Sequence, residues 1–278
     1  MSRWRVPLAF GVGGALGAAL AGHQVVARQA RAARRAIGKP LGEEAHVADR
    51  TYKSTYGDPV DLLVLGDSIA AGLGADTAKG TFGAQLAKRV AKQTGRSVRL
   101  HTAAIVGSES SMLASQLASL PPGYTADVAV IIVGGNDVTH RVRTSEAAKH
   151  LADAVVALRD AGTAVVVGTC PDLGALTAVP QPLRAMGGLA SRQLATAQRQ
   201  VTTELGGYAV SLAEVVGPFF VAQPDQMFSL DRFHPSSAGY RRTAKAMLPA
   251  VLAALGVASS LPHGHHGPAA EPVAPAGP

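Results

Sequence analysis

The sequence predicts an α/β protein with a parallel sheet covered by helices on both faces. Between residues 61 and 255, short runs rich in Val, Ile and Leu alternate with longer helical stretches. Several runs are apolar at consecutive positions, as in strands that are buried on both sides. With right-handed crossovers, this alternation gives a three-layer, doubly wound α/β/α arrangement of about five strands.

The expected strands are the apolar runs themselves, and each is followed by a helical stretch. In chain order they are "DLLVLG" at 61–66, "VRLHTA" at 98–103, "VAVIIVG" at 128–134, "AVVVGT" at 164–169 and "YAVSL" at 208–212. The expected helices cover residues 81–94, 109–120, 145–161, 186–205 and 237–255. Ligands of such folds bind beyond the carboxyl ends of the strands, so the segments that follow the strands are where we expect a site.

Basic residues are concentrated at the start of the chain. Residues 1–40 hold seven of the 26 lysines and arginines and no acidic residue, and the remaining 19 cations equal the 19 acidic residues. Residues 41–278 are therefore formally neutral. Because a nucleic-acid-binding domain is expected to carry a basic patch on its folded part, we expect no nucleic-acid partner.

Within that basic segment, residues 6–27 are uncharged and almost wholly apolar. A stretch of this length can span a bilayer as an uncleaved anchor. The basic start, the apolar run and "ALA" at 19–21 equally fit a cleaved signal peptide. We therefore expect residues 1–40 to associate with a membrane or to direct export to the cell envelope, with the orientation open.

Two further segments flank the domain predicted at residues 61–257. Residues 41–60 are polar, contain Gly and Pro and lack a period, which predicts a linker. Residues 258–278 are rich in Pro, Gly and Ala, which predicts a disordered tail. The tail histidines could bind a metal, but a solvated tail is the simpler interpretation, and we expect neither a metal nor a cofactor.

Polar residues with catalytic potential follow several expected strands. Ser68 follows the first strand and is either a helix cap or a nucleophile. Gly107 and Asn136 follow the second and third strands. Each alone is typical of a loop glycine or of a turn or cap asparagine, but a backbone N–H and a side-chain amide at these places can also stabilise an oxyanion. Asp231 and His234 precede the last helix, and a histidine backed by a carboxylate can take a serine proton. All these segments return to one edge of the sheet.

These blocks resemble those of the SGNH (GDSL) hydrolase family. The resemblance rests on "GDSI" at 66–69, Gly107, "GGND" at 134–137 and "DRFHP" at 231–235, in this order over about residues 60–255. It implies a flavodoxin-like α/β/α fold, with Ser68 as nucleophile, His234 as base and Asp231 as its orienting carboxylate. It also implies an oxyanion hole formed by the Ser68 and Gly107 N–H groups and the Asn136 side chain.

The function expected from this resemblance is cleavage of carboxylic esters or thioesters through an acyl-enzyme. The substrate would be a small-molecule, lipid or glycan ester, and the sequence does not select among them. Two alternatives stay open. One is acyl transfer to an acceptor other than water, in lipid or envelope modification, and the other is a membrane-tethered binding module with a vestigial site.

Overall fold

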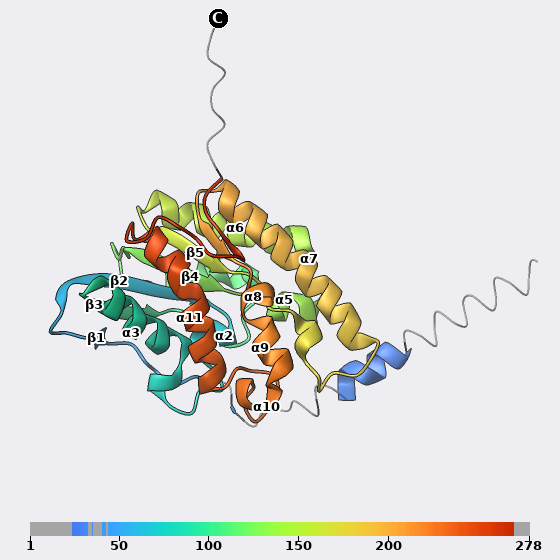
Figure 1. The fold of residues 1–278 in the computed structure, drawn as a ribbon. Helices are drawn as coiled ribbons and strands as arrows, with labels where there is room; N and C mark the ends of the chain where they lie inside the picture. Colours follow the sequence, from blue (N-terminus) through green and yellow to red (C-terminus); the bar gives the residue numbers. More distant parts are fainter. Residues whose placement is uncertain (1–23, 33–34, 36–40, 43, 270–278) are drawn as a thin grey trace, which may run out of the picture.

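In the computed structural model, a seven-stranded sheet lies between two layers of helices (Figure 1). The structure describes residues 24–269 except 33–34, 36–40 and 43. The strands are β1 (Thr51–Tyr52), β2 (Gly57–Gly66), β3 (Arg96–Thr102), β4 (Val128–Ile132), β5 (Ala164–Gly168), β6 (Tyr208–Val210) and β7 (His265–His266). Their spatial order is β1-β3-β2-β4-β5-β6-β7. The five central strands are parallel and the two short edge strands are antiparallel to their neighbours.

The five expected helices form within a few residues of their predicted bounds. They are α3 (Phe82–Thr94), α4 (Leu113–Ala118), α6 (Thr144–Asp160), α7 (Leu183–Glu204) and α11 (Ser237–Ala254). The stretch expected at 109–120 is divided into a 3-10 turn, η2 (Ser110–Met112), and α4. Short helices beyond these five are α2 (Ser68–Ala71), α5 (Gly135–His140), α8 (Leu212–Val215), α9 (Gly217–Ala222) and α10 (Pro224–Met227). Two further 3-10 turns are η1 (Ala78–Gly80) and η3 (Leu173–Ala175).

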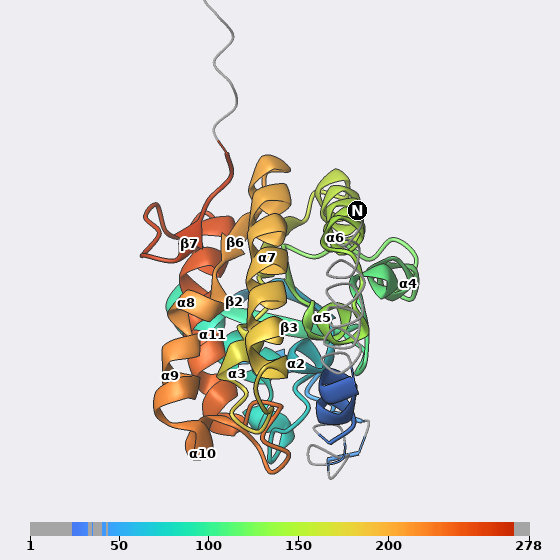
Figure 2. The ribbon, with the colours of Figure 1, turned by 90° about the vertical axis from the view of Figure 1, so that its right-hand side faces the viewer.

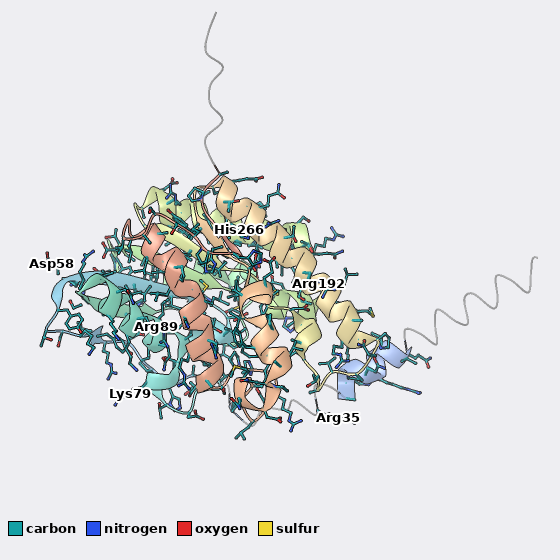
Figure 3. All side chains as sticks on the ribbon, in the orientation of Figure 1. Arg35, Asp58, Lys79, Arg89, Arg192 and His266 are labelled. Carbon is teal, nitrogen blue, oxygen red and sulfur yellow. The ribbon has the colours of Figure 1, made fainter. Side chains whose placement is uncertain are left out.

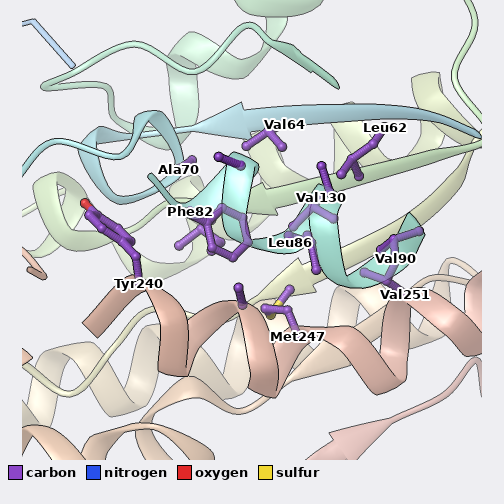
Figure 4. Close-up of a cluster of buried hydrophobic side chains, with 14 of the residues drawn as sticks. Leu62, Val64, Ala70, Phe82, Leu86, Val90, Val130, Tyr240, Met247 and Val251 are labelled. Atoms are coloured by element: carbon purple, nitrogen blue, oxygen red, sulfur yellow. The ribbon is translucent and has the colours of Figure 1, made fainter. Parts of the chain in front are cut away.

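Each face of the sheet has its own apolar core. Helices α3 and α11 cover one face, where Phe82, Tyr240 and Met247 are fully buried against alternate residues of β2 and β4 (Figure 4). Helix α6, with parts of α4 and α7, covers the other face, and Leu151 and Val155 are buried there. Figure 2 shows α11 and α6 on opposite sides of the molecule. The double coverage explains why β4 is buried at all five positions and apolar throughout.

Two of the expected flanking segments are instead part of the sheet. The predicted linker at 41–60 is wrong in part, because β1 and the first residues of β2 lie within it. The predicted disorder of 258–278 is wrong for residues 258–269. There β7 pairs with β6, Ser211 donates its N–H to the Gly264 carbonyl, and the ring of His265 bonds the Ala246 carbonyl. Backbone pairing at a sheet edge needs few apolar side chains, so composition gave no sign of it.

The segment expected to engage a membrane lies largely outside the described residues, which begin at residue 24. Residues 24–32 are helical. No helix in the described part of the chain is both long enough and apolar enough to cross a membrane.

Candidate active site

Ser68 begins helix α2 directly beyond the end of β2. The strand turns at Gly66, whose φ is +128°, and a Cβ there would lie 1.9 Å from the Ile132 carbonyl oxygen. Asp67 caps the helix, because its carboxylate accepts the Ile69 N–H at 2.9 Å. Ser68 is therefore not the cap, and its Oγ lies 3.0 Å from Nε2 of His234.

His234 lies in the loop before α11 and is oriented by Asp231. Its Nδ1 lies 2.6 Å from Oδ2 of Asp231, while Oδ1 of the same carboxylate accepts the backbone N–H groups of Phe233 and His234. Burial alone would raise the pKa of Asp231, but these hydrogen bonds outweigh it and lower the pKa below its ordinary value. The carboxylate thus stays charged and holds Nδ1 protonated, which leaves Nε2 free to accept the Ser68 proton.

Asn136 lies in the first turn of α5, beyond the end of β4. The chain enters this helix through Gly134, whose φ is +135°. The side-chain Nδ2 of Asn136 donates one hydrogen to the Ser108 carbonyl at 2.9 Å. A primary amide has two such hydrogens, so the second stays available to a ligand. Asn136 and Ser68 line the same cavity.

Gly107 lies in the loop between β3 and η2 and is exposed. It adopts a φ of +84° with open space where a Cβ would stand. It is not among the residues that line the cavity around Ser68. Within the part of the chain that the structure describes, the N–H groups of Gly107 and Ser68 have no hydrogen-bond partner, which leaves both available as donors.

Two buried polar residues that no sequence motif singles out hold these loops together. Gln116 is fully buried on α4, accepts the Gly66 N–H and donates to the Gly66 carbonyl and to Ser108 Oγ. Gln198 on α7 likewise accepts the Cys170 N–H and donates to the Val133 carbonyl. Each glutamine ties a strand end to a neighbouring loop, and a buried amide with its partners satisfied fixes their relative position. No local sequence pattern reveals these glutamines, because most of their hydrogen-bond partners lie 28 to 65 residues away along the chain.

Asp67 and Asp137 are buried acids beneath the site. Burial raises the pKa of Asp67 to about 6, against the opposing effects of the Ile69 N–H and the charge of His234. Burial also raises the pKa of Asp137, whose carboxylate accepts the backbone N–H and the hydroxyl of Ser110. Asp67 stabilises the turn after β2 as the cap of α2. Asp137 fixes η2 beside α5, whereas His140 points away and contacts Glu109.

A cavity of about 790 Å³, including its open mouth, adjoins Ser68. Its polar lining comprises Asp67, Ser68, Asn136 and His234, together with Asp172 and Thr243. The remaining walls are largely apolar and come from η3, α8, α9 and the loop before α11: Leu173, Leu176, Leu212, Val216, Phe220, Phe228 and Phe233. Such a cavity suits a ligand with one polar reacting group and an apolar remainder.

Cys170 and the tail histidines lie outside this arrangement. Cys170 is fully buried among Ala147 and Leu194, and burial raises the pKa of its thiol. Among the residues that the structure describes, no group of three His, Cys, Asp or Glu side chains could hold a metal ion.

Comparison with known proteins gives the family from the sequence and the fold from the structure. A family model described as the GDSL-like lipase/acylhydrolase family matches residues 64–242. A GDSL-like esterase of Mycobacterium tuberculosis (strain ATCC 25618 / H37Rv) is 43% identical over 197 residues, which cover 70% of this chain and 63% of that relative. The match thus spans less than two thirds of the relative's length.

Among solved structures, an α/β hydrolase from the metagenome of Lake Arreo, Spain, superimposes with a TM-score of 0.56 at 20% identity, covering 74% of this chain and 99% of that one. The psychrotrophic esterase EstA from Pseudoalteromonas superimposes with a TM-score of 0.56 at 17% identity, covering 70% and 98%. At these identities the likeness concerns the fold alone, and it agrees with the three-layer α/β/α architecture predicted from the sequence.

Proposed function

Because the chain belongs to the GDSL-like lipase/acylhydrolase family, we propose that it is a serine esterase that works through an acyl-enzyme on Ser68. The observation that carries the proposal is the relay from Ser68 Oγ to His234 Nε2, at 3.0 Å, and from His234 Nδ1 to Asp231, at 2.6 Å. These side chains come from two segments 166 residues apart and meet beside a largely apolar cavity.

In the first half of the reaction, Ser68 Oγ attacks the ester carbonyl carbon while His234 Nε2 takes the serine proton. The imidazolium that forms is stabilised by the buried Asp231 carboxylate. Collapse of the tetrahedral intermediate breaks the bond to the alcohol, which leaves with the proton from His234. In the second half, His234 takes a proton from the water that attacks the acyl carbon. The second tetrahedral intermediate then collapses, the bond between the acyl carbon and Ser68 Oγ breaks, and His234 returns the proton to Ser68 as the acid leaves.

The negative charge on the tetrahedral oxygen needs donors that are already in position. The proposed donors are the Ser68 and Gly107 N–H groups and the second amide hydrogen of Asn136. The hydrogen bond from Asn136 to the Ser108 carbonyl supports this role, because it fixes the amide before substrate arrives. The unpartnered N–H groups of Ser68 and Gly107 support it further.

The cavity supports an ester with an apolar group on one side of its carbonyl. Moving a hydrocarbon group from water into contact with these aliphatic and aromatic walls is favourable by about 0.8 kcal/mol for each buried methylene. A polar sugar would leave its hydroxyls unpaired against the same walls.

Labelling with a fluorophosphonate probe tests the nucleophile directly. The wild-type protein should be labelled, and Ser68→Ala should abolish labelling while its circular dichroism is unchanged. Ser115→Ala, which removes an exposed serine on α4, serves as the matched control and should label like the wild type. Labelling that survives in Ser68→Ala would refute the assignment. Folded wild-type protein that neither labels nor hydrolyses p-nitrophenyl esters would instead favour a binding module.

For the start of the chain, we propose that residues 1–40 tether the protein to a membrane or direct its export. The uncharged stretch at 6–27 with arginines on both sides supports this proposal. The intact mass of the protein from its native host would decide between the two: loss of the first 21 to 27 residues indicates a signal peptide, and full retention indicates an anchor. A full-length chain found only in the soluble fraction would refute both.

A further inference from the structure

The face formed by α3 and α11 carries cations that the net charge of the domain conceals. A groove there, with an open volume of about 660 Å³, is lined by Arg89 of α3, by Arg241, Arg242 and Lys245 of α11, and by Gln223, Gln226, Met227 and Ala238. Lys79 and Lys88 extend the charge along the same side of the molecule, where Figure 3 shows Lys79 and Arg89. We call these six cations the basic face: Lys79, Lys88, Arg89, Arg241, Arg242 and Lys245.

The cations of the basic face are not neutralised by their surroundings. No carboxylate lines the groove. Among the described residues, no carboxylate oxygen lies within 4 Å of a side-chain nitrogen of these six. Burial and then the charge of Arg241 lower the pKa of Arg89, and burial and then the charges of Arg50 and Lys79 lower that of Lys88. The cations therefore repel one another, and an anion on this face would relieve the repulsion.

Exposed apolar side chains lie on the segments next to the groove, α9 and the loop after α10. Val221 on α9 is 62% exposed, and Leu230, in the loop after α10, is 88% exposed. The guanidinium of Arg242 stacks on the ring of Phe219, 4.3 Å from its centroid, so α9, which carries Val221, packs against one cation of the basic face. Cations beside protruding apolar side chains fit a lipid surface, where the first meet phosphate groups and the second enter the interface. Nucleic acid offers phosphates but no apolar layer to receive an aliphatic side chain.

We propose that the basic face, with Val221 beside it, docks on an anionic membrane surface and binds the phosphate groups of its lipids. The proposal does not depend on the esterase activity. It does affect the active site, because α9 and the loop after α10 supply Phe220 and Phe228 to the cavity wall and Gln223 to the groove. Docking would thus bring the cavity beside the lipid layer.

The test must separate docking of this face from attachment through the start of the chain. Full-length Val221→Cys is labelled with an environment-sensitive fluorophore, and full-length Val156→Cys serves as the control. Val156 is an exposed valine, 41% accessible, on α6 at the opposite side of the sheet. The native Cys170 is fully buried and does not compete for the label. Vesicles are phosphatidylcholine alone, or with roughly a third phosphatidylglycerol.

The fluorophore at position 221 should shift to the blue with anionic vesicles and not with phosphatidylcholine alone, and the one at 156 should not shift. High salt should weaken the effect. Each cation near an anionic surface strengthens partitioning about fivefold, so Arg241→Glu with Lys245→Glu should reduce the apparent affinity at position 221 at least about 25-fold. The same charge reversal at Lys149 and Arg159 of α6 should have a much smaller effect.

Four results would overturn the proposal. They are no shift at position 221, equal shifts at 221 and 156, a shift that is independent of anionic lipid, and an affinity that the Arg241/Lys245 reversal leaves unchanged. A shift with a short DNA duplex but none with anionic vesicles would also overturn it, in favour of a nucleic-acid surface. Attachment through the start of the chain alone would leave both fluorophores in water.

Discussion

The buried carboxyl group of Asp67 should make the stability of the folded chain depend on pH in a defined direction. Asp67 is 2% exposed, and its pKa rises from 3.8 to about 6 in the fold, chiefly through burial. The folded state therefore holds the Asp67 proton between these values while the unfolded state releases it. Its contribution to stability is fully present below about pH 3.8 and is lost as the pH rises through about 6.

The interval between 3.8 and about 6 corresponds to about 3 kcal/mol of unfolding free energy. Asp67→Asn removes the titration but keeps a side-chain oxygen that can accept the Ile69 N–H as the cap of α2. The stability of the variant minus that of the wild type should therefore increase between pH 4 and pH 7.5 by about 2–3 kcal/mol. Any fixed cost of the amide shifts this difference equally at every pH.

Urea unfolding followed by circular dichroism measures both proteins at several pH values. Asp160→Asn, the same exchange at an exposed position at the end of α6, is the matched control for the loss of a carboxylate. A difference for Asp67→Asn that does not change with pH would refute the reasoning, because it would mean that Asp67 is equally easy to ionise in the folded and unfolded chain.

Three further predictions concern the loops and the edge of the sheet. Asn136→Ala should lower kcat by about 10²–10³ on a p-nitrophenyl ester, measured with fluorophosphonate-titrated enzyme, and an unchanged kcat would exclude Asn136 as an oxyanion donor. Gly66→Ala should lower the unfolding free energy by more than about 3 kcal/mol, because the new Cβ would meet the Ile132 carbonyl. Gly107→Ala places its Cβ in open space and should lower the unfolding free energy by only about 1–2 kcal/mol, the cost of the positive φ. Removal of residues 259–278 should lower the free energy of unfolding, measured in urea, by about 2–4 kcal/mol, because β7 and the hydrogen bond from Ser211 N–H to the Gly264 carbonyl are lost. An unchanged value would mean that β7 does not stabilise the fold.

The sequence determined the central fold because periodicity and burial agree there. The five parallel strands and the helices between and after them were predictable, since a strand covered on both faces must be apolar throughout, as β4 is. The edge strands were not, because β1 and β7 have two residues each and are held by backbone pairing rather than by apolar side chains. The same reason accounts for the wrong prediction of disorder at residues 258–269.

The candidate residues Ser68, Asn136, Asp231 and His234 were chosen from the sequence because each lies where a strand end or the last helix was expected. Only the tertiary structure decided which of these side chains meet and which residue caps α2. It made Asp67 the cap, and so freed the Ser68 hydroxyl to face His234 at 3.0 Å. Distance along the chain carries no information about such contacts, whereas the packing of α2 against the loop before α11 fixes them.

The same division applies to charge. From the sequence, residues 41–278 are neutral, which argued against a basic surface. The fold places Arg89 beside Arg241 across two helices, in a groove whose lining includes no carboxylate. Net charge is a sum over the sequence, whereas the surface potential depends on where each charge lies. Those places are decided only when α3 and α11, far apart in the chain, pack on one face of the sheet.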